Sequence, residues 1–102
     1  SVYLIAEINI HDRVGYASYE AGFMAIFSRH KGKLLAVEES PEPLEGTWEH
    51  TRTVLIEFPS AALAHAWYDS AEYQALAKHR LASSEANVVL VKGLELPTSD
   101  RG

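Results

Sequence analysis

The sequence predicts a single domain of the α+β class, in which a four-stranded antiparallel sheet carries two helices on one face in the order βαββαβ. Three observations support this prediction. Four short apolar runs have the length and composition of strands. Two longer segments repeat apolar residues at helical spacing, one after the first strand and one after the third. The length of 102 residues suits one domain and hardly permits two.

The first half of the chain follows the order strand, helix, strand. A strand is expected at 2–9, where one alternating set of residues is wholly apolar and the other is half apolar. Asp12 is the expected N-cap of the helix, since its carboxylate can accept from the free N–H groups of the next turn. Apolar and aromatic residues at three- and four-residue steps predict a helix at 13–31, and Gly32 is expected to close it in the left-handed conformation. The second strand is expected at 33–38.

An irregular acidic segment, ESPEPLEGTWEH at 39–50, separates the two halves. Pro41 and Pro43 oppose regular strand pairing, and Gly46 permits a turn. A loop of this length in a small domain is commonly functional or mobile.

The second half repeats the plan. A strand is expected at 51–58, and Pro59 ends it because proline cannot donate to a sheet. Ser60 and Ser70 are expected to cap two successive helical segments, so a break is predicted near Asp69. The face of the second segment that is expected to be buried carries Tyr73, Leu76, Ala77 and Leu81.

The last strand is expected at 87–92, so that one domain covers 1–93 and residues 94–102 form a tail. Together the two halves give a ferredoxin-like sandwich. Its helices cover one face of the sheet, yet the other face also carries apolar residues such as Ile5 and Leu55. Such a face needs a partner, and a second copy of the chain under two-fold symmetry is the economical one. We therefore expect a homodimer that packs sheet against sheet.

Composition excludes several classes of function. The net charge of -5 argues against a nucleic-acid partner, because such proteins usually carry a basic face. The absence of cysteine excludes disulfides, thiol nucleophiles and cysteine-ligated metal. No apolar run is long enough to span a membrane, and the first residues form an apolar strand pattern without the basic region of a signal peptide. A cytoplasmic location without nucleic-acid or membrane partners is the expectation.

Four phrases of the sequence, YLIAEINI, EPLEGTW, VLIEFPS and AWYDSAEYQAL, resemble the uncharacterised DUF1330 family of the dimeric α/β-barrel superfamily. The resemblance extends over residues 2–92. It implies a ferredoxin-like protomer and a homodimer whose two sheets form a barrel. It assigns no chemistry, because the wider superfamily includes monooxygenases, lactone isomerases, haem-dependent enzymes and plain binding proteins. One departure is visible at the first helix, which begins His-Asp-Arg where members often read Asp-Pro-Glu.

Glu7 and Glu57 are the first candidate catalytic pair. They share strand parity with Ile5 and Leu55 in strands that this fold places side by side. If both carboxylates face the barrel, their mutual repulsion would raise at least one pKa and could create a general acid or base. The alternative is that both lie near strand ends, in solvent or beside a basic side chain.

Trp48, His50 and Arg52 form a second candidate cluster, at the end of the acidic loop. An early start of the strand would let His50 and Arg52 point the same way. Histidine titrates near neutral pH, a guanidinium can hold a carboxylate or enolate, and Trp48 could close over a flat ligand. The alternative is a loop held by a buried tryptophan, with Arg52 neutralising nearby glutamates.

Aromatic residues are numerous on both helices, and most are expected in the core. Tyr19 is the exception, because its hydroxyl would need a partner if buried and could otherwise donate to a substrate oxygen. No histidine pair has the helical spacing that binds zinc, so no metal is expected, and a site that the fold assembles from His50 and a glutamate is the alternative. No phosphate-binding loop or dinucleotide fingerprint is present, so no cofactor is expected. The five histidines occupy separate elements: His11, His30, His50, His65 and His79.

The leading hypothesis is a homodimer that binds a small, partly apolar carboxylate or carbonyl compound in a pocket between sheet and helices. If the protein is an enzyme, we expect cofactor-free proton transfer such as isomerisation. Glu7 or Glu57 would then be the base, and Arg52, His50 or Tyr19 would hold the substrate oxygen.

Two other hypotheses belong to different classes. The protein could be a non-catalytic structural or interaction module that uses its acidic loop, with Trp48, to dock a partner protein. It could also be a haem- or metal-dependent oxidase, which would need a histidine facing the barrel.

Overall fold

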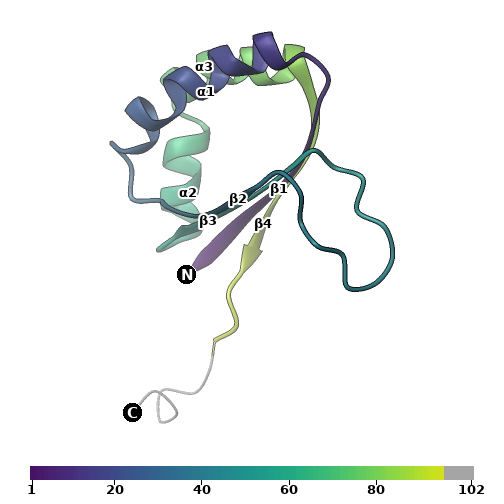
Figure 1. Ribbon diagram of the computed structural model, residues 1–102. Coiled ribbons are helices and arrows are strands. Elements are labelled where there is room, and N and C mark those ends of the chain that lie inside the picture. Colours follow the sequence, from purple (N-terminus) through teal and green to yellow (C-terminus); the bar gives the residue numbers. More distant parts are fainter. Residues whose placement is uncertain (96–102) are drawn as a thin grey trace.

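The computed structural model describes residues 1–95, and the last part of the predicted tail, 96–102, lies outside them. Figure 1 shows a layer of helices above one face of a sheet. The elements are β1 (Val2–Ile10), α1 (Arg13–Phe27), β2 (Lys33–Glu38), β3 (Arg52–Phe58), α2 (Ala61–Tyr68), α3 (Ala71–Ser83) and β4 (Ser84–Lys92). The strands pair antiparallel in the order β2-β3-β1-β4. The ferredoxin-like prediction is confirmed, with the second helical region divided in two.

Side-chain caps fix the start of each helix as expected. The Asp12 carboxylate accepts from the Gly15 N–H at 3.0 Å. The Ser60 hydroxyl accepts from the Leu63 N–H at 3.2 Å. The Ser70 hydroxyl donates to the Trp67 carbonyl of α2 at 2.8 Å and accepts from the Tyr73 N–H of α3 at 3.1 Å. Each accepted bond satisfies a donor that the first helical turn leaves free. The break predicted near Asp69 is therefore present.

Gly32 does not close α1, which ends at Phe27, four residues before the predicted end. The backbone of Gly32 does not have a positive φ; among residues 1–95 only Gly46 does, at 73°. A Cβ atom at position 32 would lie 2.6 Å from the Phe27 ring and 2.7 Å from the Phe58 ring. Glycine is required here because two aromatic rings approach the backbone closely.

The strand register divides the sheet into two unlike faces. Leu4 lies opposite Ile56 and Leu90, on the face that the helices cover. Ile5 lies opposite Leu55 and Val89, on the other face. No helix of residues 1–95 covers this second face, which we call the open face (Figure 1).

The core is built around the buried Trp67 ring of α2. Its centroid lies 4.3 Å from that of Tyr73, 5.6 Å from Phe27 and 5.7 Å from Phe58. Helix α1 packs along α3, and α2 approaches β1 and β3. The aromatic rings thus fill much of the space between the helices and the sheet.

Helix α3 differs from its predicted orientation. Leu81, expected in the core, is 66% exposed, whereas Arg80 is only 6% exposed. The buried face of α3 therefore carries a guanidinium in its last turn.

The longest helix, α1, has 15 residues. Nowhere in residues 1–95 does a helix have the length and apolarity needed to cross a bilayer.

Candidate ligand cavity

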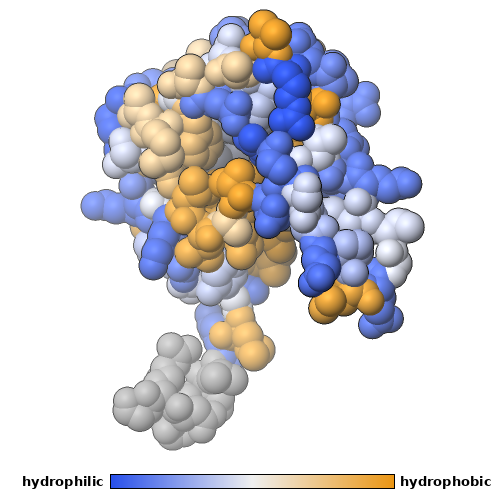
Figure 2. All heavy atoms as spheres, in the orientation of Figure 1, coloured by the Kyte–Doolittle hydropathy of each residue, from blue (hydrophilic) through white to orange (hydrophobic). Residues whose placement is uncertain are grey.

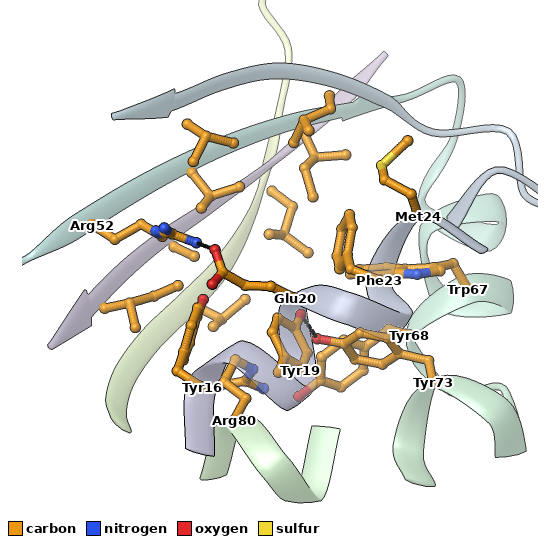
Figure 3. A pocket seen from close by; sticks show the side chains of 18 residues that line it. Tyr16, Tyr19, Glu20, Phe23, Met24, Arg52, Trp67, Tyr68, Tyr73 and Arg80 are labelled. Atoms are coloured by element: carbon orange, nitrogen blue, oxygen red, sulfur yellow. Dashed lines mark hydrogen bonds and ion pairs between the residues drawn. The ribbon is translucent and has the colours of Figure 1, made fainter. Parts of the chain in front are cut away.

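A cavity of ≈ 200 Å³ lies between the helices and the sheet (Figure 3). Its sheet side is aliphatic apart from Arg52, because the helix-facing residues of β1, β3 and β4 alternate regularly along each strand. These side chains are Leu4, Ala6, Ile8, Val54, Ile56 and Val88. The opposite side is aromatic and comes from all three helices.

The cavity reaches the surface between α1 and the edge strand β2. Met24, Leu34 and Val37 line it and are also exposed. Figure 2 shows hydrophobic surface gathered in the middle of this face, below the helix layer.

Arg52 lies on the helix side of β3 and forms ion pairs with two carboxylates. Its Nη1 donates to Glu20 Oε2 at 2.6 Å, and its Nε donates to Glu39 Oε2 at 2.5 Å. Its guanidinium also lies 5.2 Å from the centroid of the Tyr16 ring. Hydrogen bonds from Arg52 and Arg13 hold the pKa of the Glu39 carboxyl below its usual value. The Arg52 charge is therefore already neutralised within the chain.

Tyr19 and Tyr73 form a buried hydroxyl pair across the cavity wall. Their oxygens are 2.7 Å apart, and both residues are almost fully inaccessible to solvent. Burial, followed by the neighbouring Tyr73, raises the pKa of Tyr19 far above its usual value. The Tyr19 phenol therefore stays protonated at neutral pH and can act as a hydrogen-bond donor.

Arg80 also lines the cavity and has a different environment from Arg52. No carboxylate of residues 1–95 lies within 4.0 Å of its side-chain nitrogens. Its neighbours are phenols: its guanidinium lies 5.9 Å from the Tyr19 ring centroid, and burial, which disfavours its charge, is opposed by Tyr73, with which it also forms a hydrogen bond. Figure 3 shows the Arg80 side chain beside those of Tyr16 and Tyr19. The cavity therefore contains one buried cation without an anion.

The model of a family described as a domain of unknown function, DUF1330, matches residues 1–94. The chain belongs to the DUF1330 family. No curated protein matches it.

Solved structures similar to this DUF1330 chain share its fold at low identity. A protein of unknown function from Rhodopseudomonas palustris, RPA0582, is 19% identical with a TM-score of 0.76, over 93% of this chain and 83% of its own. SnoaB, a cofactor-independent oxygenase from Streptomyces nogalater, is 15% identical with a TM-score of 0.65, over 93% and 94%. A dimeric ferredoxin-like protein of unknown function from Jannaschia sp. CCS1 is 17% identical with a TM-score of 0.65, over 90% and 98%.

The predicted site residues of the DUF1330 chain fall on two sides of the sheet. Tyr19 and Arg52 line the cavity. Glu7, Glu57 and His50 do not line it. Since Glu7 and Glu57 share the parity of Ile5, they belong to the open face.

The structure does not bring Glu7 and Glu57 together within one chain. Glu7 lies opposite Thr53, and Glu57 lies opposite Tyr3. Four residues along a strand separate the two positions by about 13 Å, so their carboxylates do not repel each other. The proximity expected from strand parity is absent because parity fixes the face of a residue and not its register.

His50 is directed to the open face and not toward Arg52. Its Nε2 lies 3.4 Å from Glu7 Oε2, and its Nδ1 lies 3.4 Å from the Asn9 amide nitrogen. Strand β3 begins only at Arg52, so the two side chains do not share a strand face as expected. Arg52 instead neutralises Glu20 and Glu39, in agreement with the alternative stated for it.

Trp48 lies against His50, with ring centroids 5.5 Å apart. Its indole N–H donates to the Thr53 hydroxyl at 2.9 Å. The ring is 43% exposed and is thus not buried as the structural alternative required. It lies away from the cavity, so it cannot close over a ligand bound there.

Sequence reasoning missed Arg80, although a signal for it exists. Tyr73, Ala77 and Arg80 follow each other at steps of four and three residues, which places them on one helix face. Because Arg80 is charged, its apolar neighbour Leu81 was expected to be the buried residue instead. The unusual position of Arg80 is itself informative, because arginine is seldom buried without a paired anion.

Within the described part of the chain, no three side chains among histidine, aspartate and glutamate are grouped so that they could hold a metal ion.

Proposed function

We propose that this DUF1330 protein binds a small, partly apolar carboxylate or carbonyl compound in the cavity between helices and sheet. The observation that carries the proposal is the combination of an aliphatic floor with a few polar groups at one end, Arg52, Arg80 and Tyr19. Small-molecule sites have this composition. An apolar cavity of about 150 Å³ accommodates benzene, so ≈ 200 Å³ suits a ligand with one ring and a short substituent.

The reaction that we favour, if the ligand is turned over, is cofactor-free proton transfer such as isomerisation. Support comes by analogy of fold from SnoaB, described as a cofactor-independent oxygenase, although a shared fold does not determine chemistry. Catalytic roles for Glu7, Glu57 and His50 stay predictions. Because the sheet separates these three residues from the cavity, they would act only on a ligand at the open face, and Tyr19 and Arg52 would hold oxygen only for a ligand in the cavity.

A second copy of the chain is proposed to cover the open face. Val89 and Val91 on this face are 52% and 43% exposed, and Ile5 and Leu55 lie beside them. The Jannaschia neighbour is described as dimeric, which supports the same arrangement here. Two open faces in contact would enclose a barrel.

Ligand binding can be tested with fluorine NMR of two probes, para-fluoroacetophenone and para-fluorobenzoate. The proposal expects saturable binding of at least one probe. Val88→Phe places a ring in the cavity and should abolish binding, since Val88 lines it. Leu81→Phe is the control, because Leu81 is 66% exposed and does not line the cavity, so binding should be unchanged. Saturable binding that survives Val88→Phe would show that the probes bind elsewhere.

The interaction-module alternative also has an observation in its favour. Leu44, in the acidic loop, is 88% exposed near the half-exposed Trp48. If neither probe binds and Leu44→Ser abolishes capture of a partner protein, this alternative replaces the ligand-binding proposal.

A further inference from the structure

The polar groups that line the cavity differ in how their hydrogen-bonding capacity is used. Within residues 1–95, Glu20 is the only carboxylate that lines the cavity, and it accepts a hydrogen bond from Arg52 at 2.6 Å. Arg52 also binds Glu39. The charge of Arg52 is therefore neutralised by Glu20 and Glu39 without a ligand.

The Tyr19 and Tyr73 hydroxyls have a donor in excess. Two phenols carry two O–H protons, and their mutual 2.7 Å bond uses one of them. The Tyr73 oxygen also accepts a hydrogen bond from Arg80, but this bond uses a lone pair of the oxygen and no O–H proton. One O–H is therefore available at the cavity wall, and the group that satisfies it must be an acceptor.

Arg80 adds a larger excess of donors. A guanidinium has N–H donors and no acceptor, and it carries its charge at every physiological pH. Arg80 is 6% exposed, and no carboxylate of the described residues is within ion-pair distance. The face of the Tyr19 ring at 5.9 Å and a hydrogen bond with Tyr73 offer partial compensation. Since a guanidinium has five N–H donors, these contacts leave N–H groups of Arg80 for an anion.

We propose that Arg80, with the Tyr19–Tyr73 hydroxyl pair, forms an anion subsite, and that the ligand of this cavity is a carboxylate bound through Arg80. This inference rests on the proposed function and narrows it from carboxylate or carbonyl compounds to carboxylate anions.

The physical reason is the cost of a buried charge without a partner. Removing a guanidinium from water is expensive, and a well-placed anion offsets much of that cost. A carboxylate can accept two parallel N–H bonds from a guanidinium and a further bond from a phenol. A neutral ketone or alcohol supplies no charge. The cavity should therefore discriminate by charge at nearly constant ligand size.

The test compares para-fluorobenzoate with para-fluorobenzyl alcohol, two probes of similar shape that differ in charge. Dissociation constants are measured by fluorine NMR for the whole chain. Benzoate is expected to bind about tenfold to a hundredfold more tightly than the alcohol, the range of a charge-assisted hydrogen bond. Arg80→Gln should reduce this preference to near one, and Arg80→Lys should retain part of it. Arg29→Gln, at an exposed arginine, should change nothing.

The outcomes distinguish a failure of the proposed function from a failure of the anion subsite alone. If neither probe nor para-fluoroacetophenone binds, the proposed function fails and the anion subsite fails with it. If the alcohol binds as tightly as benzoate, or if Arg80→Gln keeps the preference, the cavity binds ligands but the anion subsite is refuted. If Arg80→Gln does not fold, the unmodified chain provides the test. Its preference for para-fluorobenzoate over the alcohol must disappear as the pH falls and the probe carboxylate is protonated, because a neutral acid brings no charge to Arg80.

Discussion

The Tyr19–Tyr73 hydroxyl pair permits a quantitative test of how the cavity wall is built. Tyr73→Phe removes one hydroxyl and leaves the Tyr19 hydroxyl buried without its 2.7 Å partner. A buried polar group left unpaired costs about 1–3 kcal/mol of the free energy of unfolding. For a domain of this size, each kcal/mol corresponds to a fall in Tm of about 4–8 °C. Tyr19→Phe should have an effect of the same sign and similar size.

The double variant Tyr19→Phe/Tyr73→Phe should be more stable than either single variant. Replacing both partners of a hydrogen bond by apolar groups of the same shape can be nearly neutral. The expected coupling free energy is therefore about 1–3 kcal/mol, well above the scatter of about 0.5 kcal/mol for independent sites. Urea unfolding followed by circular dichroism gives all four values, with Tyr3→Phe on the open face as the control. Additive effects of the two substitutions would show that the hydroxyls do not depend on each other and would contradict the Tyr19–Tyr73 pair on which the anion subsite is built.

Three further predictions concern pH, packing and assembly. Arg52 lowers the pKa of the Glu39 carboxyl, so this ion pair stabilises the folded chain above the ordinary carboxyl pKa and loses that effect as the pH falls. Arg52→Gln should therefore make the free energy of unfolding decline less steeply in acid. A series of urea midpoints at different pH values tests this, and an unchanged slope would contradict it. Gly32→Ala should lower the free energy of unfolding by about 2 kcal/mol or more, since the alanine Cβ would overlap the Phe27 and Phe58 rings. A Tm within a degree of that of the unmodified chain would refute this packing. Sedimentation should find a species of twice 11.3 kDa, and Val89→Asp should shift it toward the monomer; a chain that sediments as a monomer at micromolar concentration would refute the dimer.

The helix starts and the strands could be predicted because their signals are local. Asp12, Ser60 and Ser70 are capping residues followed by helical periodicity, and the structure uses each of them as an N-cap. The role of Gly32 could not be predicted in the same way. Its requirement comes from Phe58, a residue far away in the sequence, whose ring meets the glycine only after the sheet has formed.

In the candidate site, too, only the features with local signals could be predicted from the sequence. Alternation along β1 and β3 placed Glu7 and Glu57 on one face correctly, but their separation depends on a register that no local pattern specifies. Tyr19 was recognised because a buried hydroxyl requires a partner, and Tyr73 supplies it. Arg80 was missed because a charged residue is a poor expectation for a helix face that packs inward. Its helical spacing from Tyr73 and Ala77 contained the signal.

The central claim is that the ligand site lies on the helix side of the sheet, around Arg80. Titration of the labelled chain with para-fluorobenzoate, followed by amide NMR shifts, tests this most directly. The largest changes are predicted in α1 and α3 around Tyr19, Tyr73 and Arg80. Changes concentrated around Glu7 and His50 would place the ligand on the open face instead and contradict the claim.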